Sequence, residues 1–196
     1  GVRMLQEIFH GPQEIVPVKD GETLSLGNME LSFMETRMIH WPDSMFTYLA
    51  AERVLFSQDA FGMHLATLER FADEISAATL EYEAATYYAN IVLPYSQVVL
   101  KALEKVAKTG WKINIIAPDH GPVWRKDIST IIGLYQKWAA QKPAAKAVVV
   151  YATMWHSTEK MAAVIAESLA QEGIKVKLLS MNEAHRSEVV YEVLDA

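Results

Sequence analysis

The sequence predicts an α/β protein. Short apolar runs separated by turn residues fill residues 14–56, as expected for a series of paired strands. Residues 80–108 instead repeat apolar side chains at helical spacing. Residues 146–170 then combine one more apolar run, a hydroxyl-rich turn and a helix start. Strand-like and helix-like segments therefore share one chain, which indicates sheets covered by helices.

Composition limits the function before any motif is considered. The 196 residues are 51% hydrophobic, enough to bury a sizeable core, and their net charge of -6 argues against nucleic acid or anionic membranes as partners. The sequence contains no cysteine, so a bound metal would have to use histidine and carboxylate ligands. There is no apolar run of about 18 residues and no basic leader, so we expect a cytoplasmic protein without a membrane partner.

The first part of the chain is expected to contain short strands that end in polar residues. These strands are residues 14–18, 23–26, 29–33, 35–40, 45–49 and 54–56. Gly27-Asn28 is a plausible tight hairpin turn between two of them. The strand before Trp41 ends on His40, and the second hairpin leads to Asp59.

Helices and one further strand follow. Helical spacing predicts helices over residues 80–91, 97–108 and 127–141. Thr109-Gly110 is expected to close the second helix, because glycine readily adopts the left-handed conformation found there. The strand at residues 113–117 is followed by His120, and residues 141–146 are interpreted as a linker.

Three candidate metal ligands thus follow apolar strands: His40, Asp59 and His120. Sites in layered α/β folds form beyond the ends of strands, so we expect the three side chains to converge. Two imidazoles and a carboxylate suit zinc or non-haem iron. Each residue also has an ordinary structural interpretation: a capped strand end, a turn former, and a histidine paired with Asp119.

The histidines outside this set are given other interpretations. His10, His64 and His185 lack the strand-end setting and are expected to be surface or loop residues. His156 belongs to the turn described next.

Residues 147–152 are predicted to be a parallel strand covered on both faces, and residues 157–170 a helix. The turn between them is a candidate phosphate site, because hydroxyls and free N–H groups at a helix start attract anions. The turn residues are Thr153, Met154, Trp155, His156, Ser157 and Thr158. Trp155 suggests an aromatic ring system next to the phosphate. The alternative is ordinary helix capping by Ser157 or Thr158.

Only one more strand, residues 175–179, and one more helix, near 185–195, follow this turn. Two parallel strands cannot cover their own hydrophobic faces, so residues 146–196 are expected to be the first part of a larger doubly wound domain. The opening residues resemble the tail of a helix, so both ends of the chain are expected to be cut.

Five motifs, taken together, resemble the flavodiiron proteins, also called A-type flavoproteins or rubredoxin:oxygen oxidoreductases, and occur in that family's order. They are Met38-Ile-His-Trp-Pro-Asp-Ser-Met45, Leu55-Phe-Ser-Gln-Asp59, Tyr87-Tyr-Ala-Asn-Ile91, Ala117-Pro-Asp-His-Gly121 and Thr153-Met-Trp-His-Ser-Thr-Glu159. The resemblance implies a metallo-β-lactamase-like αββα domain, residues 1–142, and a flavodoxin-like domain, residues 146–196. It implies a diiron centre in the first domain and FMN in the second.

The resemblance also implies roles for particular residues. His40 and His120 would each bind one iron, and Asp59 would bridge both. Either Tyr87 or Tyr88 would line the metal pocket, and the turn from Thr153 would hold the FMN phosphate. Electrons would pass from a rubredoxin-type or other donor protein through FMN to the irons, which reduce dioxygen to water or nitric oxide to nitrous oxide, in a head-to-tail homodimer.

The family's remaining iron ligands come from a His-x-Glu-x-Asp motif, and residues 1–39 contain none. The chain is therefore expected to be a fragment that lacks the start of the metal domain and the end of the flavin domain, and to be inactive alone. Two alternatives stay open: a mononuclear zinc hydrolase, and a non-catalytic flavin or electron carrier.

Overall fold

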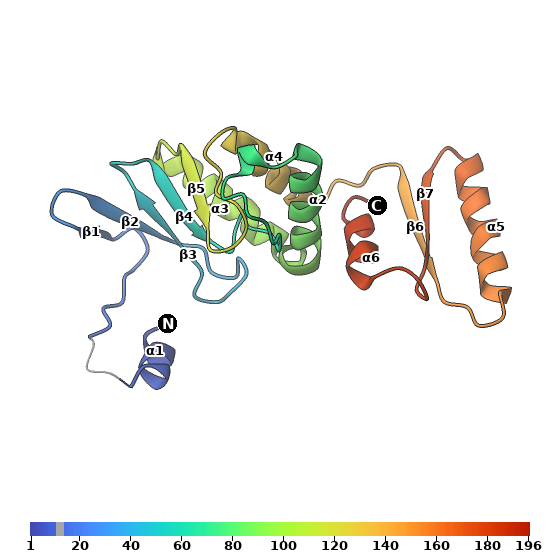
Figure 1. Ribbon diagram of the computed structural model, residues 1–196, viewed down its shortest axis with the longest axis horizontal. Helices are drawn as coiled ribbons and strands as arrows, with labels where there is room; N and C mark the ends of the chain where they lie inside the picture. The colour runs from blue at the N-terminus through green and yellow to red at the C-terminus, as the bar shows by residue number, and fades with distance from the viewer. Residues whose placement is uncertain (11–13) are drawn as a thin grey trace.

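The computed structural model describes residues 1–10 and 14–196 and contains two sheets (Figure 1). The first part of the chain consists, in order, of α1 (Val2–Ile8), β1 (Thr23–Ser25), β2 (Glu30–Glu35), β3 (Met45–Leu49), β4 (Val54–Gln58), the short helix η1 (Ala72–Glu74), α2 (Ala77–Tyr87), the short helices η2 (Tyr88–Val92) and η3 (Leu93–Tyr95), α3 (Ser96–Thr109), β5 (Ile115–Pro118) and α4 (Ile128–Ala139). The second part consists of β6 (Lys146–Tyr151), α5 (Ser157–Gln171), β7 (Lys175–Ser180) and α6 (Arg186–Val193).

The larger sheet has five strands in the order β1-β2-β3-β4-β5. The first four strands pair antiparallel with their neighbours, and β5 pairs parallel with β4. Strands β2, β4 and β5 therefore run in the same direction. Their carboxyl ends meet at one edge of the sheet, and this edge carries the candidate metal ligands.

Both predicted hairpins are confirmed, but two predicted strand segments are wrong. Residues 14–18 are not in a strand, and β2 stops at Glu35 instead of continuing to residue 40. Beyond Glu35 the chain folds back on itself, with the Thr36 N–H donating to the Ser44 carbonyl at 2.9 Å. Apolar residues occur in both segments, yet neither segment finds a neighbouring strand. A strand needs a pairing partner as well as a suitable sequence.

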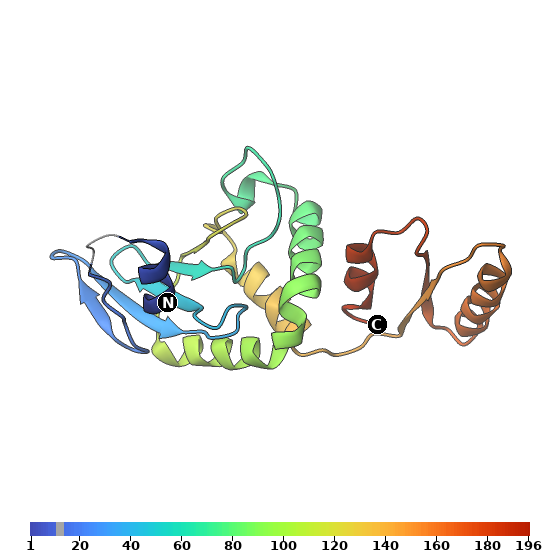
Figure 2. The same cartoon turned by 90° about the horizontal axis from the view of Figure 1, so that it is seen from below.

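The helices match the sequence pattern closely. Pro94 lies between α2 and α3, where the α-helix gives way to the wider helix η2 and the tighter helix η3, because proline cannot donate to a helical hydrogen bond. Gly110 ends α3 with a φ of 71°, the left-handed conformation expected there. Helices α3 and α4 pack against each other, and Figure 2 shows α3 running alongside the sheet.

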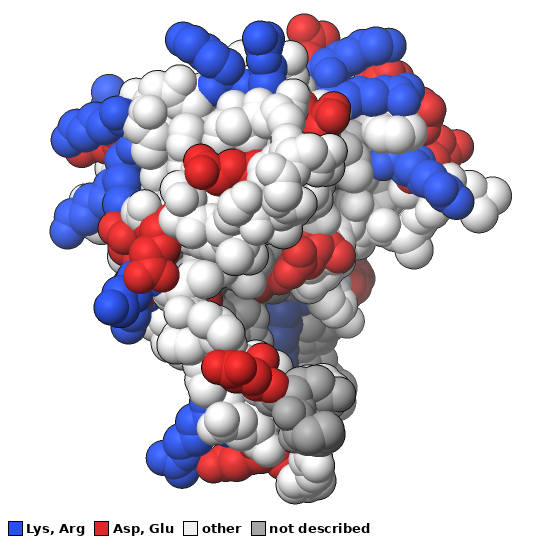
Figure 3. Space-filling view, turned by 90° about the vertical axis from the view of Figure 1, so that its left-hand side faces the viewer, with Lys and Arg blue, Asp and Glu red and all other residues white. Residues whose placement is uncertain are grey.

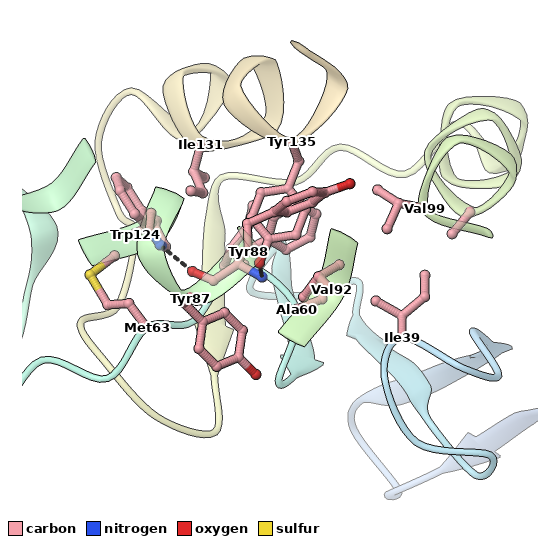
Figure 4. Packing of buried hydrophobic residues seen from close by; sticks show 14 of the residues in the cluster. Ile39, Ala60, Met63, Tyr87, Tyr88, Val92, Val99, Trp124, Ile131 and Tyr135 are labelled. Atoms are coloured by element: carbon pink, nitrogen blue, oxygen red, sulfur yellow. Dashed lines mark hydrogen bonds between the residues drawn. The ribbon is translucent and has the colours of Figure 1, made fainter. Parts of the chain in front are cut away.

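The core lies between the helices and one face of the sheet. Alternate strand residues point into it, as in β4, where Leu55 is 1% exposed and the next residue, Phe56, is 42% exposed. Figure 4 shows the aromatic centre of this core, where Tyr135 of α4 lies beside Tyr88. The Phe61 N–H donates to the Tyr135 hydroxyl at 2.9 Å, and the Trp124 indole donates to the Phe61 carbonyl at 3.0 Å. The core therefore fixes the backbone of the loop that follows β4.

The smaller sheet consists of the parallel pair β6 and β7, with α5 on one face and α6 on the other (Figure 1). Both strands and both helices agree with the sequence prediction. The expectation that the strand is buried on both faces is wrong, because Val150 is 41% exposed. The apolar face of α5 is also open, with Met161 66% and Ile165 51% exposed.

Helix α6 connects the two parts. It lies against the first part through the rings of Tyr191 and Tyr82, whose centroids are 5.0 Å apart. It is held to β6 by Lys146, whose ammonium group lies 3.0 Å from Glu192 and 2.7 Å from Asp195. The linker before β6 is tied to the end of the chain, because the Ala144 N–H donates to the Asp195 carbonyl at 2.9 Å.

The helices and one face of the molecule can be compared with membrane-spanning and nucleic-acid-binding proteins. Of the helices in residues 1–10 and 14–196, none is both long and apolar enough to cross a membrane. On the face shown in Figure 3, positive and negative side chains are interspersed. Clustered positive charge, the usual feature of a nucleic-acid surface, is not the pattern of this face.

Candidate metal centre and phosphate turn

The three predicted ligands meet at the edge of the sheet. The Nε2 atom of His40 lies 3.2 Å from Oδ2 of Asp59, and the Nε2 atom of His120 lies 3.4 Å from Oδ1 of the same carboxylate. The predicted convergence is therefore confirmed. Each oxygen of Asp59 faces one imidazole, so the carboxylate lies between the two rings.

The sheet topology explains this convergence. Asp59 directly follows β4, and His120 lies two residues beyond the end of β5 at Pro118. Because β4 and β5 are parallel neighbours, their ends deliver both residues to the same place. His40 arrives differently, from the turn after β2, with the Met38 N–H donating to the Trp41 carbonyl at 2.6 Å.

His120 is oriented by a second contact. Its Nδ1 atom lies 3.1 Å from the carbonyl oxygen of Met63. A carbonyl only accepts, so Nδ1 carries the proton in this hydrogen bond, and Nε2 is directed at Asp59. Metal-binding histidines are commonly held in this way, with the outer nitrogen bonded to a carbonyl.

The two adjacent tyrosines have different surroundings, which decides between them. Tyr87 packs edge-on against His120 with ring centroids 5.0 Å apart, whereas Tyr88 lies in the core and exchanges a 3.0 Å hydrogen bond with Ser96. Figure 4 shows Tyr88 beside Tyr135 and Tyr87 projecting away from it. Tyr87 is therefore the tyrosine beside the candidate ligands.

The hydroxyl of Tyr87 is buried and unpaired. It has no hydrogen-bond partner among the described residues, and the side chain is 3% exposed. Burial, with a smaller contribution from the charge of Asp59, raises the pKa of Tyr87 far above its usual range. The group therefore stays a neutral O–H donor at physiological pH, with no acceptor among the described residues.

His64 also contacts this cluster, which the sequence reasoning missed. It lies in an exposed loop, as predicted, but its ring centroid is 5.3 Å from that of His120 and 4.9 Å from that of Tyr87. No sequence signal of its own marks it, because it does not directly follow a strand. Only its closeness in sequence to Asp59 could have indicated it.

The donor set fits metal ions, although it does not enclose one. In residues 1–10 and 14–196, no group of three or more His, Asp or Glu side chains could hold a metal ion by itself. The imidazoles approach different oxygens of Asp59, and imidazole and carboxylate are donors that zinc and non-haem iron accept.

The loop beside His120 depends on the close approach of two backbone segments. A Cβ atom added to Gly121, whose φ is +81°, would lie 3.0 Å from both N and O of Met63. Gly110 has a similar φ of +71°, but a Cβ there would meet nothing within 4 Å.

These two glycines form a matched pair for a stability test. We expect Gly110→Ala to lower the free energy of unfolding by about 1–2 kcal/mol, the cost of a left-handed alanine. Gly121→Ala should lower the free energy of unfolding by about 2–4 kcal/mol, because the new methyl group would also press against the rigid backbone of Met63. Urea unfolding measures both, and equal losses would contradict the tight packing of Gly121 on Met63.

The candidate phosphate turn lies at the amino end of α5. Helix α5 begins at Ser157, and His156 before it has a φ of 63° and makes no side-chain capping hydrogen bond. Capping by Ser157 or Thr158 is therefore wrong, since both residues lie inside the first helical turn. Their hydroxyls make no hydrogen bond within the described residues, and both side chains are exposed.

The other residues of the turn are partly fixed. The carbonyl of Thr153 accepts a 2.7 Å hydrogen bond from Asn182, which ties the turn to the end of β7. His156 is 2.6 Å from Glu159. Met154 and Trp155 are 80% and 83% exposed. The turn thus presents two hydroxyls, a helix amino end and an indole to the solvent.

Comparison with known proteins identifies the family. ODP family beta lactamase matches residues 3–121, and flavodoxin matches residues 149–196. The nitric oxide reductase of Moorella thermoacetica is 48% identical over 179 residues, covering 91% of this chain and 45% of that protein. The rubredoxin-oxygen oxidoreductase of Megalodesulfovibrio gigas is 45% identical over 199 residues, covering 100% of this chain and 50% of that protein. The chain belongs to the flavodiiron protein family.

Solved structures agree with this assignment. The rubredoxin oxygen:oxidoreductase of Desulfovibrio gigas superposes with a TM-score of 0.94 at 45% identity, covering 100% of this flavodiiron chain and 49% of that one. The flavodiiron protein of Giardia intestinalis gives a TM-score of 0.83 at 35% identity, covering 90% of this chain and 43% of that one.

The resemblance drawn from the five motifs is confirmed, as is the order of a beta-lactamase-like region followed by a flavodoxin region. The flavodiiron chain spans about half the length of the curated relatives that it matches. The roles of the site residues and the domain limits at 142 and 146 stay predictions.

Proposed function

We propose that this chain supplies half of a diiron ligand set and the phosphate turn of an FMN site in an oxidoreductase. The reaction would reduce dioxygen to water or nitric oxide to nitrous oxide. One observation carries the proposal: Asp59 lies between His40 and His120 with one imidazole on each oxygen. The relatives named nitric oxide reductase and rubredoxin-oxygen oxidoreductase supply the reaction class.

Each side chain has a defined task in this proposal. His40 and His120 would each hold one iron through Nε2, and Asp59 would bridge them. Tyr87 would close one side of the pocket and offer its unpaired hydroxyl to the bound gas. When bound, the irons would transfer electrons to the gas and FMN would resupply them.

The second part of the chain would bind the FMN. We propose that Ser157, Thr158 and the amino end of α5 bind the FMN phosphate and that Trp155 lies against the ring system. Electrons would come from a rubredoxin-type or other donor protein, and a head-to-tail homodimer would bring each flavin close to a partner's irons.

The residues present are too few to support turnover alone. Two ions sharing two imidazoles and one carboxylate lack the donors and negative charge that hold iron well. We therefore expect no oxygen or nitric oxide reduction by the 196-residue chain supplied with iron, FMN and a reductant. An oxygen electrode checks this, and consumption above a free-FMN control that His120→Ala abolishes would contradict it.

Metal binding tests the proposal directly. Titration with zinc, a redox-inert stand-in for iron, should show two weak sites in the wild-type chain. His40→Ala and His120→Ala should each remove one site and leave the other, because each imidazole serves a different ion. His10→Ala, at an exposed histidine far along the chain from the cluster, should leave both sites. Loss of all zinc in both ligand variants would favour one shared ion.

The phosphate turn is tested separately. The double variant Ser157→Ala/Thr158→Ala should weaken FMN binding at least about tenfold, since two hydroxyl hydrogen bonds to a charged group are lost. Ser168→Ala is the matched control, because this serine is on the same helix and bonds only to the Val164 carbonyl. Quenching of flavin fluorescence measures the affinity. Equal affinity in the double variant and the control would place FMN elsewhere.

A further inference from the structure

The geometry points to His64 as a positioning residue that holds the imidazole of His120 in its metal-binding orientation. This inference rests on the proposed function, because it concerns a ligand of the proposed centre. It assigns His64 a task that does not require it to touch a metal, a substrate or the flavin.

Three aromatic rings pack together beside Asp59. His64 is tilted 36° from His120 at a centroid distance of 5.3 Å, and Tyr87 meets both histidine rings at 5.0 Å or less, edge-on. The ring of His120 therefore has two aromatic neighbours, which also contact each other. Such contacts favour particular ring orientations and resist rotation of the imidazole.

The same short segment also provides the hydrogen bond to His120. The Met63 carbonyl accepts from Nδ1 at 3.1 Å, and the adjacent residue, His64, supplies the ring contact. The hydrogen bond fixes one edge of the imidazole, and the ring contact limits its swing about that bond. Together they direct Nε2 at Oδ1 of Asp59, 3.4 Å away.

Two glycines keep this segment close to His120. A Cβ atom on Gly62 would lie 2.7 Å from the His120 carbonyl oxygen and 3.1 Å from Cε1 of its ring. On the other side, a Cβ atom on Gly121 would meet the Met63 backbone at 3.0 Å. Residues 62–64 and 120–121 are therefore packed backbone to backbone, and the ring contact of His64 follows from this close approach.

The contact of His64 is one of shape rather than of hydrogen bonding. Its ring nitrogens make no hydrogen bond to another described residue, and the side chain belongs to an exposed loop. A phenyl ring, which has no nitrogen, would therefore make the same contact with His120. This property separates a positioning role from a ligand role, because a metal ligand requires the nitrogen.

The experiment compares His64→Ala and His64→Phe in the 196-residue chain, with His10→Ala as a histidine control. Zinc affinity is measured by calorimetry, and the His120 ring is observed by NMR of ¹⁵N-labelled histidine without metal. We expect His64→Ala to weaken the site that uses His120 about threefold to tenfold and to leave the His40 site unchanged. His64→Phe should restore wild-type affinity within about twofold, because it keeps the ring contact.

The metal-free spectrum separates this inference from the proposed function. In His64→Ala we expect the His120 ring signals to shift towards an averaged mixture of tautomers, and in His64→Phe to stay as in the wild type. Unchanged His120 signals in His64→Ala would overturn the positioning role whether or not zinc binds. Equal losses of zinc in the alanine and phenylalanine variants would also overturn it, by showing that a nitrogen of His64 is required. Failure of the wild type to bind zinc, with the spectral change intact, would count against the diiron proposal alone.

Discussion

Replacing Asp59 with alanine is expected to lower zinc or iron affinity by at least about 100-fold at both proposed sites, since one anionic ligand is lost from each. Asp59 is the carboxylate within 3.4 Å of His40 and His120, and each of its oxygens faces one of the two rings. No single histidine variant should have so large an effect, because each imidazole serves one ion. Calorimetric titration of the purified variant with zinc provides the measurement.

Asp119→Ala is the control for this variant. Asp119 is next to His120 in sequence and has the same type of side chain as Asp59, but it is exposed and lies outside the pairs that Asp59 forms with His40 and His120. We expect its zinc affinity to match the wild type within about twofold, since a solvent-exposed charge contributes little. Equal affinities for Asp59→Ala and the wild type would show that Asp59 is not a ligand.

Tyr135→Ala is expected to lower the free energy of unfolding by about 3–5 kcal/mol, the usual range for removing a large aromatic ring from a core. The side chain is 1% exposed and packs against Phe61 and Tyr88 with ring centroids 4.7 and 5.0 Å away. Removing the ring creates a cavity and leaves the Phe61 N–H unpaired. Urea unfolding followed by tryptophan fluorescence measures the loss.

Two further variants separate packing from hydrogen bonding. Tyr135→Phe keeps the ring and removes only the hydroxyl that accepts from the Phe61 N–H. It should lower the free energy of unfolding by about 1–3 kcal/mol. Leu68→Ala, at a side chain that is 98% exposed, should change the free energy of unfolding by less than about 0.5 kcal/mol. A loss in Tyr135→Phe as small as that in Leu68→Ala would mean that the Phe61 bond does not stabilise the fold.

Regular elements with a strong pattern could be predicted from the sequence. Two apolar runs separated by a polar turn mark the hairpin of β3 and β4, and helical spacing with a closing glycine marks α3 and its end at Gly110. The same residues predicted where Asp59 would lie, because it directly follows a strand. Local sequence was sufficient to predict an element wherever the residues that pack against it favour the same conformation as its own pattern.

The features that could not be predicted from the sequence depend on tertiary contacts. The segment from Thr36 to His40 reads as a strand continuation, yet it forms a turn closed by hydrogen bonds to residues 41–44. The choice between Tyr87 and Tyr88 depends on which face of the helix meets the core, and both residues are equally apolar in sequence. His64 reaches His120 only because Gly62 and Gly121 allow two backbones to touch, a contact that no sequence periodicity encodes.

In the proposed diiron centre, Asp59 bridges two metal ions, each with its own imidazole. Crystals of the chain soaked in zinc and measured at the zinc absorption edge test it most directly. We expect two anomalous peaks, one about 2.0–2.1 Å from Nε2 of His40 and the other at the same distance from Nε2 of His120, with one oxygen of Asp59 on each. A single peak bound by both imidazoles, or peaks with no contact to Asp59, would contradict it.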